Sequence, residues 1–125
     1  MRTDSGPGIK TMATLKKRQQ YAVVLVTAPS MKVARKLAKI CVGLRVAACV
    51  NLVPDIESHY TWQGKAEVGK EVLMIMKTTR DCLKALEKAI LQNHPYDTPE
   101  FVVMNMAGGN ARYLHWISSS VLARR

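Results

Sequence analysis

Few side chains in this sequence could bind a metal ion, and Cys49 is the first candidate. A cysteine thiolate is a soft ligand of the kind that Cu(I) prefers. Cys49 lies within the apolar segment AACVNLV at residues 47–53, where a free cysteine commonly behaves as a small, buried and inert residue. We therefore keep two interpretations of Cys49, a metal ligand and a buried apolar side chain.

Two pairs of methionines have the two-residue spacing that places side chains on one face of a β-strand. The pairs are Met74 with Met76 and Met104 with Met106. Four thioethers on one sheet could hold Cu(I). Methionine is also an ordinary filler of irregular cores and interfaces, and we favour this interpretation.

The sequence contains no recognisable catalytic arrangement. A nucleophilic pair of Cys49 and His94 would need a group to orient the imidazole and a site for an oxyanion, and no sequence feature supplies either. The phosphate-binding patterns G-x-x-x-x-G-K-[ST] and G-x-G-x-x-G are absent as well. We therefore expect a protein that is not an enzyme.

Residues 51–79 predict one long β-hairpin. Aromatic and polar residues alternate over residues 58–62, Gly64 marks the tip, and an unbroken apolar run covers residues 72–76. The predicted arms are longer than the rest of the domain can pair, and unpaired strand edges favour pairing with a second copy of the chain. We therefore expect an oligomer.

Five residues are candidates for a cleft or an interface between copies. Tyr60 and Trp62 lie on one side of the hairpin, where paired aromatic residues could anchor a subunit interface or line a cleft. Glu71, Lys77 and Glu100 are charged residues that border apolar strands. If they are buried they need partners such as one another, and they could equally bind a small polar ligand in the cleft.

Hydrophobic periodicity and helix-capping residues predict the other elements. Strands are expected at residues 21–27, at 46–53 where Pro54 closes the strand, within the hairpin, and at 100–107. Helices are expected at 31–43 between Ser30 as N-cap and Gly43 as C-cap, at 80–93, and after Asn110 beyond the break at Gly108-Gly109. This order predicts an α+β protein, a ferredoxin-like βαββαβ sandwich with an extended β-hairpin and a C-terminal helix.

The net charge of +10 is concentrated at the two ends of the chain. Residues 1–20 carry five basic side chains and one acidic one, and Arg124 with Arg125 adds two positive charges. The remaining 12 basic and 8 acidic residues do not suggest a concentrated phosphate-binding surface, and the segment EVLMIMK has no aromatic residue for base stacking. We therefore expect no nucleic-acid partner. No segment has the roughly 18 consecutive apolar residues of a membrane span, so we also expect no direct membrane insertion.

We expect one domain at residues 21–122, with a flexible basic tail at 1–20 and a basic end at 123–125. The tail lacks the apolar core of a secretory signal and the Arg and Ser richness of a transit peptide. A cytoplasmic location is therefore our default, and organellar import by the tail stays open. Three cysteines without a C-x-x-C pair fit a reducing compartment.

Six segments resemble, in order and spacing, the divalent-cation tolerance family known as CutA, and the resemblance covers residues 21–122. The segments are VTAPS at 26–30, AACVNLVP at 47–54, SHYTWQGK at 58–65, EVLMIMKT at 71–78, HPYDTPE at 94–100 and YLHWI at 113–117. The resemblance implies a homotrimer of ferredoxin-like subunits joined by strand pairing, with an architecture like that of the PII signalling proteins.

The resemblance also implies two kinds of function. One is tolerance or binding of copper and other divalent metals, as in bacterial members. The other is scaffolding and localisation of a membrane-anchored protein partner, as in animal members. The PII-like architecture leaves a third interpretation, a sensor of a small anionic metabolite bound in the intersubunit cleft.

His94 becomes a metal candidate through this resemblance. Bacterial members present a histidine pair before Pro-Tyr and a cysteine before Thr-Ala-Pro, but in this chain those further positions are Asn93 and Val26. A single imidazole gives little metal affinity without partners. The other interpretation is that His94 interacts with the dipole and the last carbonyl groups of the helix that ends there.

Overall fold

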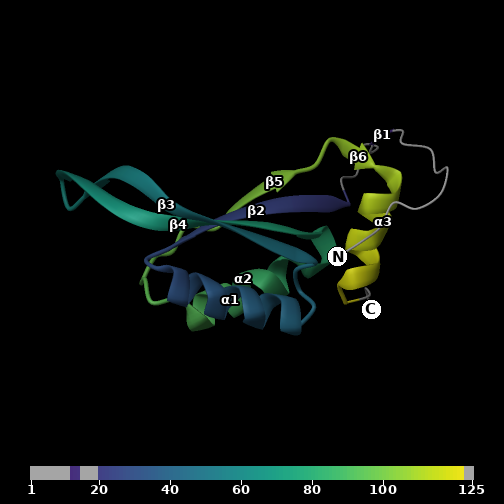
Figure 1. Ribbon diagram of the computed structural model, residues 1–125, viewed down its shortest axis with the longest axis horizontal. Helices are drawn as coiled ribbons and strands as arrows, with labels where there is room; N and C mark the ends of the chain where they lie inside the picture. Colours follow the sequence, from purple (N-terminus) through teal and green to yellow (C-terminus); the bar gives the residue numbers. More distant parts are fainter. Residues whose placement is uncertain (1–11, 15–19, 123–125) are drawn as a thin grey trace.

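A four-stranded antiparallel sheet forms the centre of the computed structural model, which describes residues 12–14 and 20–122 (Figure 1). Its strands are β2 (Tyr21–Ala28), β3 (Cys49–Trp62), β4 (Lys65–Thr79) and β5 (Val102–Asn105), in the order β3-β4-β2-β5. Helix α1 (Met31–Gly43) connects β2 to β3, and α2 (Leu83–Asn93) connects β4 to β5. The predicted α+β, ferredoxin-like fold class is therefore confirmed.

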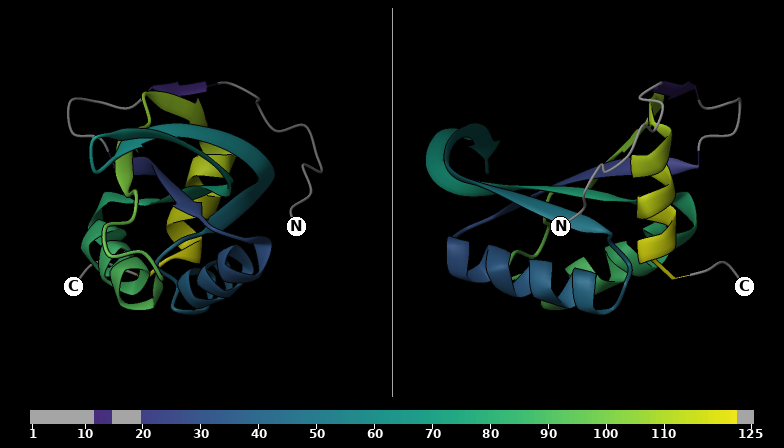
Figure 2. Two further views of the ribbon diagram at one scale, coloured as in Figure 1. Left: turned by 90° about the vertical axis from the view of Figure 1, so that its left-hand side faces the viewer. Right: turned by 45° about the vertical axis from the view of Figure 1, so that its right-hand side comes forward.

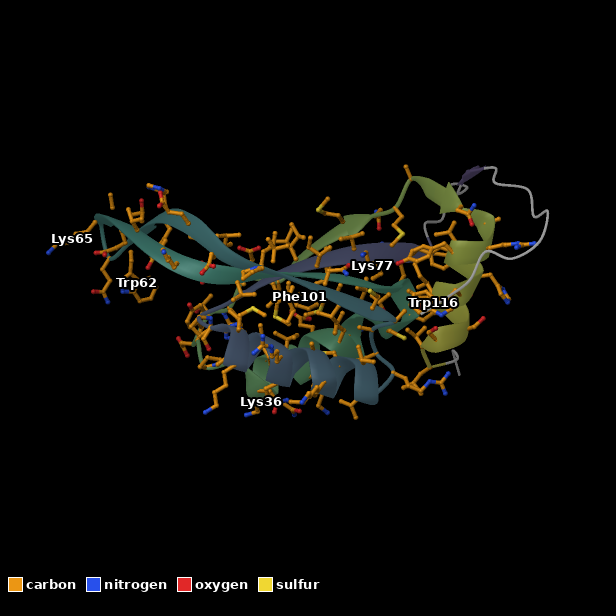
Figure 3. All side chains as sticks on the ribbon, in the orientation of Figure 1. Lys36, Trp62, Lys65, Lys77, Phe101 and Trp116 are labelled. Atoms are coloured by element: carbon orange, nitrogen blue, oxygen red, sulfur yellow. The ribbon has the colours of Figure 1, made fainter. Side chains whose placement is uncertain are left out.

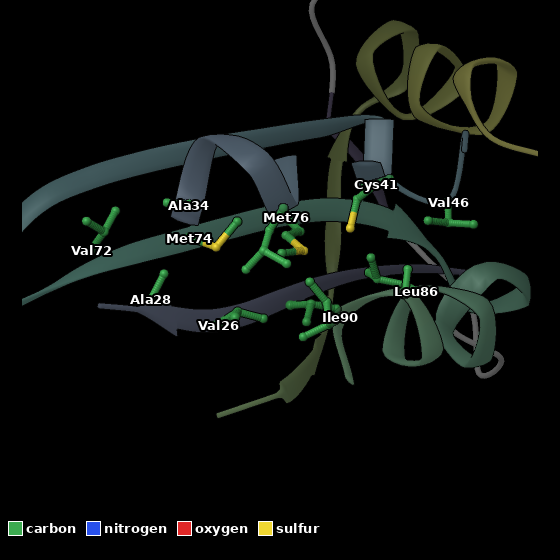
Figure 4. Packing of buried hydrophobic residues seen from close by; sticks show 14 residues of the cluster. Val26, Ala28, Ala34, Cys41, Val46, Val72, Met74, Met76, Leu86 and Ile90 are labelled. Atoms are coloured by element: carbon green, nitrogen blue, oxygen red, sulfur yellow. The ribbon is translucent and has the colours of Figure 1, made fainter. Parts of the chain in front are cut away.

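The hydrophobic core lies between the sheet and the two helices, which pack on the same face of it (Figures 1 and 4). Alternate residues of the central strands point toward the helices, because side chains alternate between the faces of a strand. The largest fully buried side chains of this core include Val24, Val26, Leu37, Met74, Met76, Leu86 and Ile90. The first methionine pair therefore fills the core, whereas Met104 on β5 is 49% exposed, so the four thioethers do not form one site.

Helix α1 begins as predicted but ends differently. The Ser30 hydroxyl accepts a hydrogen bond of 3.2 Å from the Val33 N–H, which confirms the N-cap. Gly43 was a wrong prediction for the C-cap, because it stays within the helix and the left-handed residue is Arg45, with φ of 59°. The strain of that backbone is offset by the Arg45 guanidinium, which donates to three carbonyl oxygens, of residues 119, 120 and 121, at 3.3–3.4 Å.

The prediction that Pro54 closes a strand is wrong. Strand β3 runs through Pro54, and its register with β4 shifts between Val53 and Ile56, where Asp55 has φ of 59°. One extra residue on β3 makes a β-bulge, which bends the strand. Proline is tolerated because β3 is an edge strand, on which a missing N–H can face away from the ladder.

The hairpin of β3 and β4 extends far beyond the rest of the sheet, as its length in the sequence predicted. Residues 72–79 of β4 pair with β2, whereas residues 65–71 pair with β3 alone among the described strands. Gln63 and Gly64 at the tip both have positive φ, which is the conformation of a tight turn that matches the twist of a hairpin. Figures 1 and 2 show the two arms curling away from the domain.

A second, small sheet pairs β1 (Met12–Thr14) with β6 (Gly108–Asn110). Strand β1 lies within residues 1–20, which we predicted to be a flexible tail, but Met12–Thr14 form a strand. The remaining tail residues up to 19, and residues 123–125, lie outside the described part of the chain. Gly108 and Gly109, predicted to be a break, form β6.

Two further helical segments complete the described chain. Helix α3 (Ala111–Ser120) begins at the predicted N-cap Asn110, whose side chain accepts from the Tyr113 N–H at 3.1 Å. The helix predicted at 80–93 starts with a 3₁₀ turn, η1 (Arg80–Cys82), before α2. No helix in the described ranges is long and apolar enough to cross a membrane.

Candidate functional site

Glu71 marks the point at which the hairpin leaves the sheet. It precedes Val72, which ends the pairing of β4 with β2, and it pairs with Ile56, the residue that follows the bulge. The segment between α2 and β5 brings Tyr96 to this point, and the Tyr96 phenol donates a hydrogen bond of 2.9 Å to the Glu71 Oε2. Tyr96, from the loop after α2, thus contacts the hairpin next to the bulge of β3 and the end of β2.

His94 holds Tyr96 in position. The buried imidazole donates from Nε2 to the Thr27 carbonyl oxygen at 2.7 Å, and its Nδ1 accepts from the Tyr96 N–H at 3.0 Å. The two rings also contact each other, with centroids 4.8 Å apart. Both ring nitrogens are therefore engaged, and a metal ion could take Nδ1 only by displacing the Tyr96 N–H. Cys49 lies apart from His94. Thr27, which accepts from His94, pairs with Leu73 on β4, whereas Cys49 pairs with Lys77, four residues further along the same strand. Four residues correspond to roughly 13 Å in the direction of the strand.

Glu71 accepts the hydrogen bond of Tyr96, and Glu100 lies near enough to Glu71 for the two carboxylates to repel each other. Burial, and then the charge of Glu71, raise the pKa of Glu100 above its ordinary value. Burial, the hydrogen bond to Glu71, and then the charges of Glu71 and Tyr60 raise the pKa of Tyr96 to about 12, so the phenol is a proton donor at neutral pH. Two carboxylates that repel each other attract a cation, and oxygen ligands suit hard divalent ions. Glu71, Tyr96 and Glu100 are hereafter called the acidic site.

The acidic site is incomplete as a metal centre within one copy. The described residues contain no group of three or more His, Cys, Asp and Glu side chains that could hold a metal ion. Further ligands would have to come from water or from another chain. Sequence reasoning did not single out Tyr96, although it stands in the segment HPYDTPE between two predicted candidates, His94 and Glu100.

Lys77 and Cys49 lie apart from the acidic site. They are directly paired on β4 and β3, and Asn51 Oδ1 accepts from the Lys77 Nζ and from the Cys49 thiol, whose sulfur is 3.8 Å away. Lys77 is six residues along β4 from Glu71, a distance of about 20 Å. One copy therefore does not bring Lys77 together with Glu71 and Glu100, as sequence reasoning had grouped them. Cys49 is half-buried, on the sheet face that α1 and α2 leave uncovered.

Tyr60 and Trp62 lie on the same side of the hairpin as Glu71 and are 49% and 58% exposed. The Tyr60 side chain lies over Gly69, where an added Cβ would meet its phenol at an ordinary contact distance of 3.7 Å. Figure 3 shows Trp62 near the end of the projecting arms, away from the helices. Large aromatic side chains so exposed on a hairpin are typical of a surface that contacts another molecule.

The sheet face opposite α1 and α2 is largely apolar, apart from Asn51 and Lys77. The register places Leu25 beside Ile75 and Thr27 beside Leu73 on this face, and these three aliphatic side chains are not fully buried. Further apolar residues of this face are Val53, Val102 and Met104, which are 39%, 47% and 49% exposed. We call this surface the open face. A largely apolar, partly exposed face of this kind is typical of an interaction site.

Comparison with known proteins extends over nearly the whole described domain. Residues 22–120 match the family model described as CutA1 divalent ion tolerance protein. The chain is 43% identical over 98 residues to the chloroplastic protein CutA 1 of Oryza sativa subsp. japonica, which covers 78% of this chain and 55% of that protein. The chain thus spans about half the length of that relative.

A bacterial relative and a solved structure match more completely. The divalent-cation tolerance protein CutA of Thermus thermophilus is 45% identical over 95 residues, which are 76% of this chain and 92% of that protein. The crystal structure of CutA1 from Oryza sativa has a TM-score of 0.81 and 40% identity over 83% of this chain and 95% of that chain. Sequence and fold therefore agree on the same group of proteins.

Proposed function

The chain belongs to the CutA1 divalent ion tolerance family, and on this premise we propose that it acts as a homotrimer that binds divalent metal ions, copper among them, in clefts between its subunits. The acidic site is the observation that carries the proposal, because it gathers two carboxylates and a phenol at the base of the hairpin. The Thermus relative is named for divalent-cation tolerance, which agrees with a site of this charge.

Trimer formation is supported by the hairpin and the open face. Within the part of the chain that the structure describes, residues 65–71 of β4 have β3 as their only strand partner and β3 has a free edge, so a neighbouring copy can continue the sheet there. The open face offers aliphatic side chains that would leave water on assembly. Tyr60 and Trp62 extend the same surface along the hairpin.

The metal site follows from this assembly. Glu71 stands where the hairpin leaves its own sheet, so an adjoining subunit that pairs with the hairpin would lie within reach of it. That subunit would supply the ligands that a single copy lacks. In this arrangement His94 acts by holding Tyr96 and not as a ligand, because both of its ring nitrogens are engaged.

Copper would need other ligands than the acidic site, since copper prefers sulfur and imidazole over carboxylate ligands. Cys49 is a soft donor on the open face, beside Asn51 and Lys77. We propose that copper, where it binds, uses Cys49 together with groups from neighbouring copies. Harder ions such as Mn²⁺ would use the acidic site.

Calorimetric titration with Mn²⁺ and with Cu²⁺ tests the proposal. We expect the double variant Glu71→Gln, Glu100→Gln to lose at least about tenfold in Mn²⁺ affinity. The matched double variant Glu57→Gln, Glu87→Gln, which removes two exposed carboxylates elsewhere, should bind as the parent chain does. Unchanged Mn²⁺ affinity in the first variant, or an equal loss in the second, would remove the acidic site from the proposal.

Two alternatives remain as proposals. A sensor of an anionic metabolite would need cationic groups in the cleft, and the acidic site offers the opposite charge; the test is thermal stabilisation by such a metabolite in the absence of metal. A scaffold for a membrane-anchored partner would be supported by partner recovery that requires residues 1–20. Recovery that is unchanged without those residues would exclude the tail as the contact.

The location of the protein is also a proposal. We propose the cytoplasm, because the three cysteines of the sequence are free and unpaired in the described structure, as in a reducing compartment. A chloroplastic relative supports organellar import as the alternative. Fluorescence microscopy of the full chain, with and without residues 1–20, distinguishes the two.

A further inference from the structure

Positive charge is concentrated on one layer of the described structure. Helices α1 and α2 together carry six basic side chains and one acidic one, which is a net charge of +5. All the other described residues together carry six basic and seven acidic side chains, a net charge of −1. The outer, exposed residues of these two helices are hereafter called the helix layer. The modest charge of the domain therefore conceals one strongly cationic face.

The cationic side chains of the helix layer are exposed and point away from the sheet. On α1 they recur at the spacing of one helix face, and on α2 they lie one turn apart; they are Lys32, Arg35, Lys36, Lys39, Lys84 and Lys88. Among the described residues no ion pair of these six side chains is found, whereas Glu57 and His59 on the hairpin do form one. Figure 3 shows Lys36 on the outer side of the helices. These charges are therefore available to an anionic partner.

Exposed aliphatic side chains accompany the cations. Val42 follows Lys39 by three residues and is 44% exposed, and Leu44 beyond it is 55% exposed. Leu91 follows Lys88 by three residues on α2 and is 52% exposed. Residues three apart are neighbours on a helix surface, so each of these two lysines has an aliphatic neighbour. A surface that combines lysines with exposed aliphatic groups suits a partner that is both anionic and apolar.

We propose that the helix layer binds peripherally to a membrane surface rich in anionic phospholipids. Lysines that line a protein surface are attracted to anionic headgroups, and short aliphatic side chains can enter the boundary between headgroups and acyl chains. Because the apolar faces of α1 and α2 are buried against the sheet, the two helices would lie on the membrane surface and would not insert into the hydrocarbon layer.

The composition of the helix layer favours lipid over nucleic acid. Five of its six cations are lysines, whereas arginine is the residue that recognises phosphate and bases by paired hydrogen bonds. Helices α1 and α2 contain no aromatic residue on which a base could stack. The subunit interface proposed above uses the opposite face of the sheet, so assembly would leave the helix layer accessible.

Vesicle co-sedimentation of the full chain tests the inference. Vesicles of three parts phosphatidylcholine to one part phosphatidylserine should bind the protein at low salt, and pure phosphatidylcholine vesicles should not. The variant Lys36→Gln, Lys39→Gln should lose about thirtyfold in apparent partition coefficient. The control Lys65→Gln, Lys70→Gln removes the same charge from the hairpin and should bind as the parent chain does.

Several outcomes would overturn the inference. The parent chain should neither fail to bind the phosphatidylserine vesicles nor bind both kinds of vesicle equally. Equal losses of binding in the two variants would also contradict the inference. Parent-like binding by the α1 variant would assign the attraction to another part of the chain. Binding to single-stranded RNA that is lost in the α1 variant, without vesicle binding, would assign the helix layer to nucleic acid instead. Circular dichroism of each variant verifies that the fold is retained.

Discussion

The phenol of Tyr96 donates a hydrogen bond of 2.9 Å to a carboxylate oxygen of Glu71, 25 positions away in the chain. Tyr96 belongs to the loop after α2, and Glu71 belongs to the base of the hairpin. The bond therefore links a loop that His94 holds against β2 to the two arms that project from the domain. In the proposed trimer this link stands beside the neighbouring subunit.

Replacing Tyr96 by phenylalanine removes this link and little else. We expect the free energy of unfolding of Tyr96→Phe to fall by about 1 kcal/mol, because a hydrogen bond to a charged acceptor contributes less at a solvent-exposed site than in the interior. Urea denaturation measures the difference. Tyr60→Phe is the control, since Tyr60 contributes to the exposed hairpin face; equal losses in the two variants would contradict a specific role for the Tyr96 phenol.

The same bond predicts a loss of stability at alkaline pH. The pKa of Tyr96 is raised from its ordinary value of 10.0 to about 12, so the native state keeps the proton over a range in which the unfolded chain releases it. The Tyr96 phenol makes its whole contribution to stability below pH 10, and this contribution decreases as the pH rises toward 12. The decrease should be smaller in Tyr96→Phe. Equal slopes of unfolding free energy against pH in both proteins would contradict the assignment.

We predict that the variant Glu100→Gln is more stable than the parent chain at neutral pH. Because the native environment raises the pKa of Glu100, the unfolded chain ionises first and the group costs stability as the pH rises. Glu100→Gln removes that cost, so the metal-free variant should gain up to about 1 kcal/mol at pH 7, a value kept small by solvent screening. The gain should disappear below the ordinary pKa of 4.5. A gain that persists in acid would point to another cause.

Sequence reasoning predicted those elements whose signals are local. Ser30 and Asn110 are short polar residues before helical patterns, and both cap a helix as expected. Pro54 was misinterpreted because its effect depends on whether the strand is at an edge, which only the sheet order decides. Arg45 escaped notice because the carbonyl groups that retain it lie about 75 residues away, at the end of α3.

The candidate site depended still more on the tertiary structure. Glu71 and Glu100 were singled out as charges beside apolar strands, but nothing local indicated that Tyr96 would join them. Lys77 carries the same kind of sequence signal as Glu71 and yet lies far along the strand from it. The sequence pattern places the four basic residues of α1 on one helix face, which by itself suggests a solvated surface. It does not reveal that α2 packs beside α1 on the sheet and adds two lysines to the same layer.

The variant His94→Ala tests whether His94 positions Tyr96 or binds the metal ion. We expect His94→Ala to lower the free energy of unfolding by about 2–4 kcal/mol, because it leaves the buried Thr27 carbonyl and the Tyr96 N–H without partners. The Mn²⁺ affinity of the folded variant should decrease less than that of Glu71→Gln, Glu100→Gln. Calorimetric titration compares the two, and a larger loss in His94→Ala would make His94 a ligand.

Analytical ultracentrifugation of the full chain at micromolar concentration tests the central claim most directly, because the proposed clefts exist only between copies. We predict one species of three times the 13.9 kDa chain mass. We also predict that Ile75→Asp, which places a charge on the open face, dissociates this species while circular dichroism retains the folded signal. A stable single-chain species of the parent protein would contradict the account.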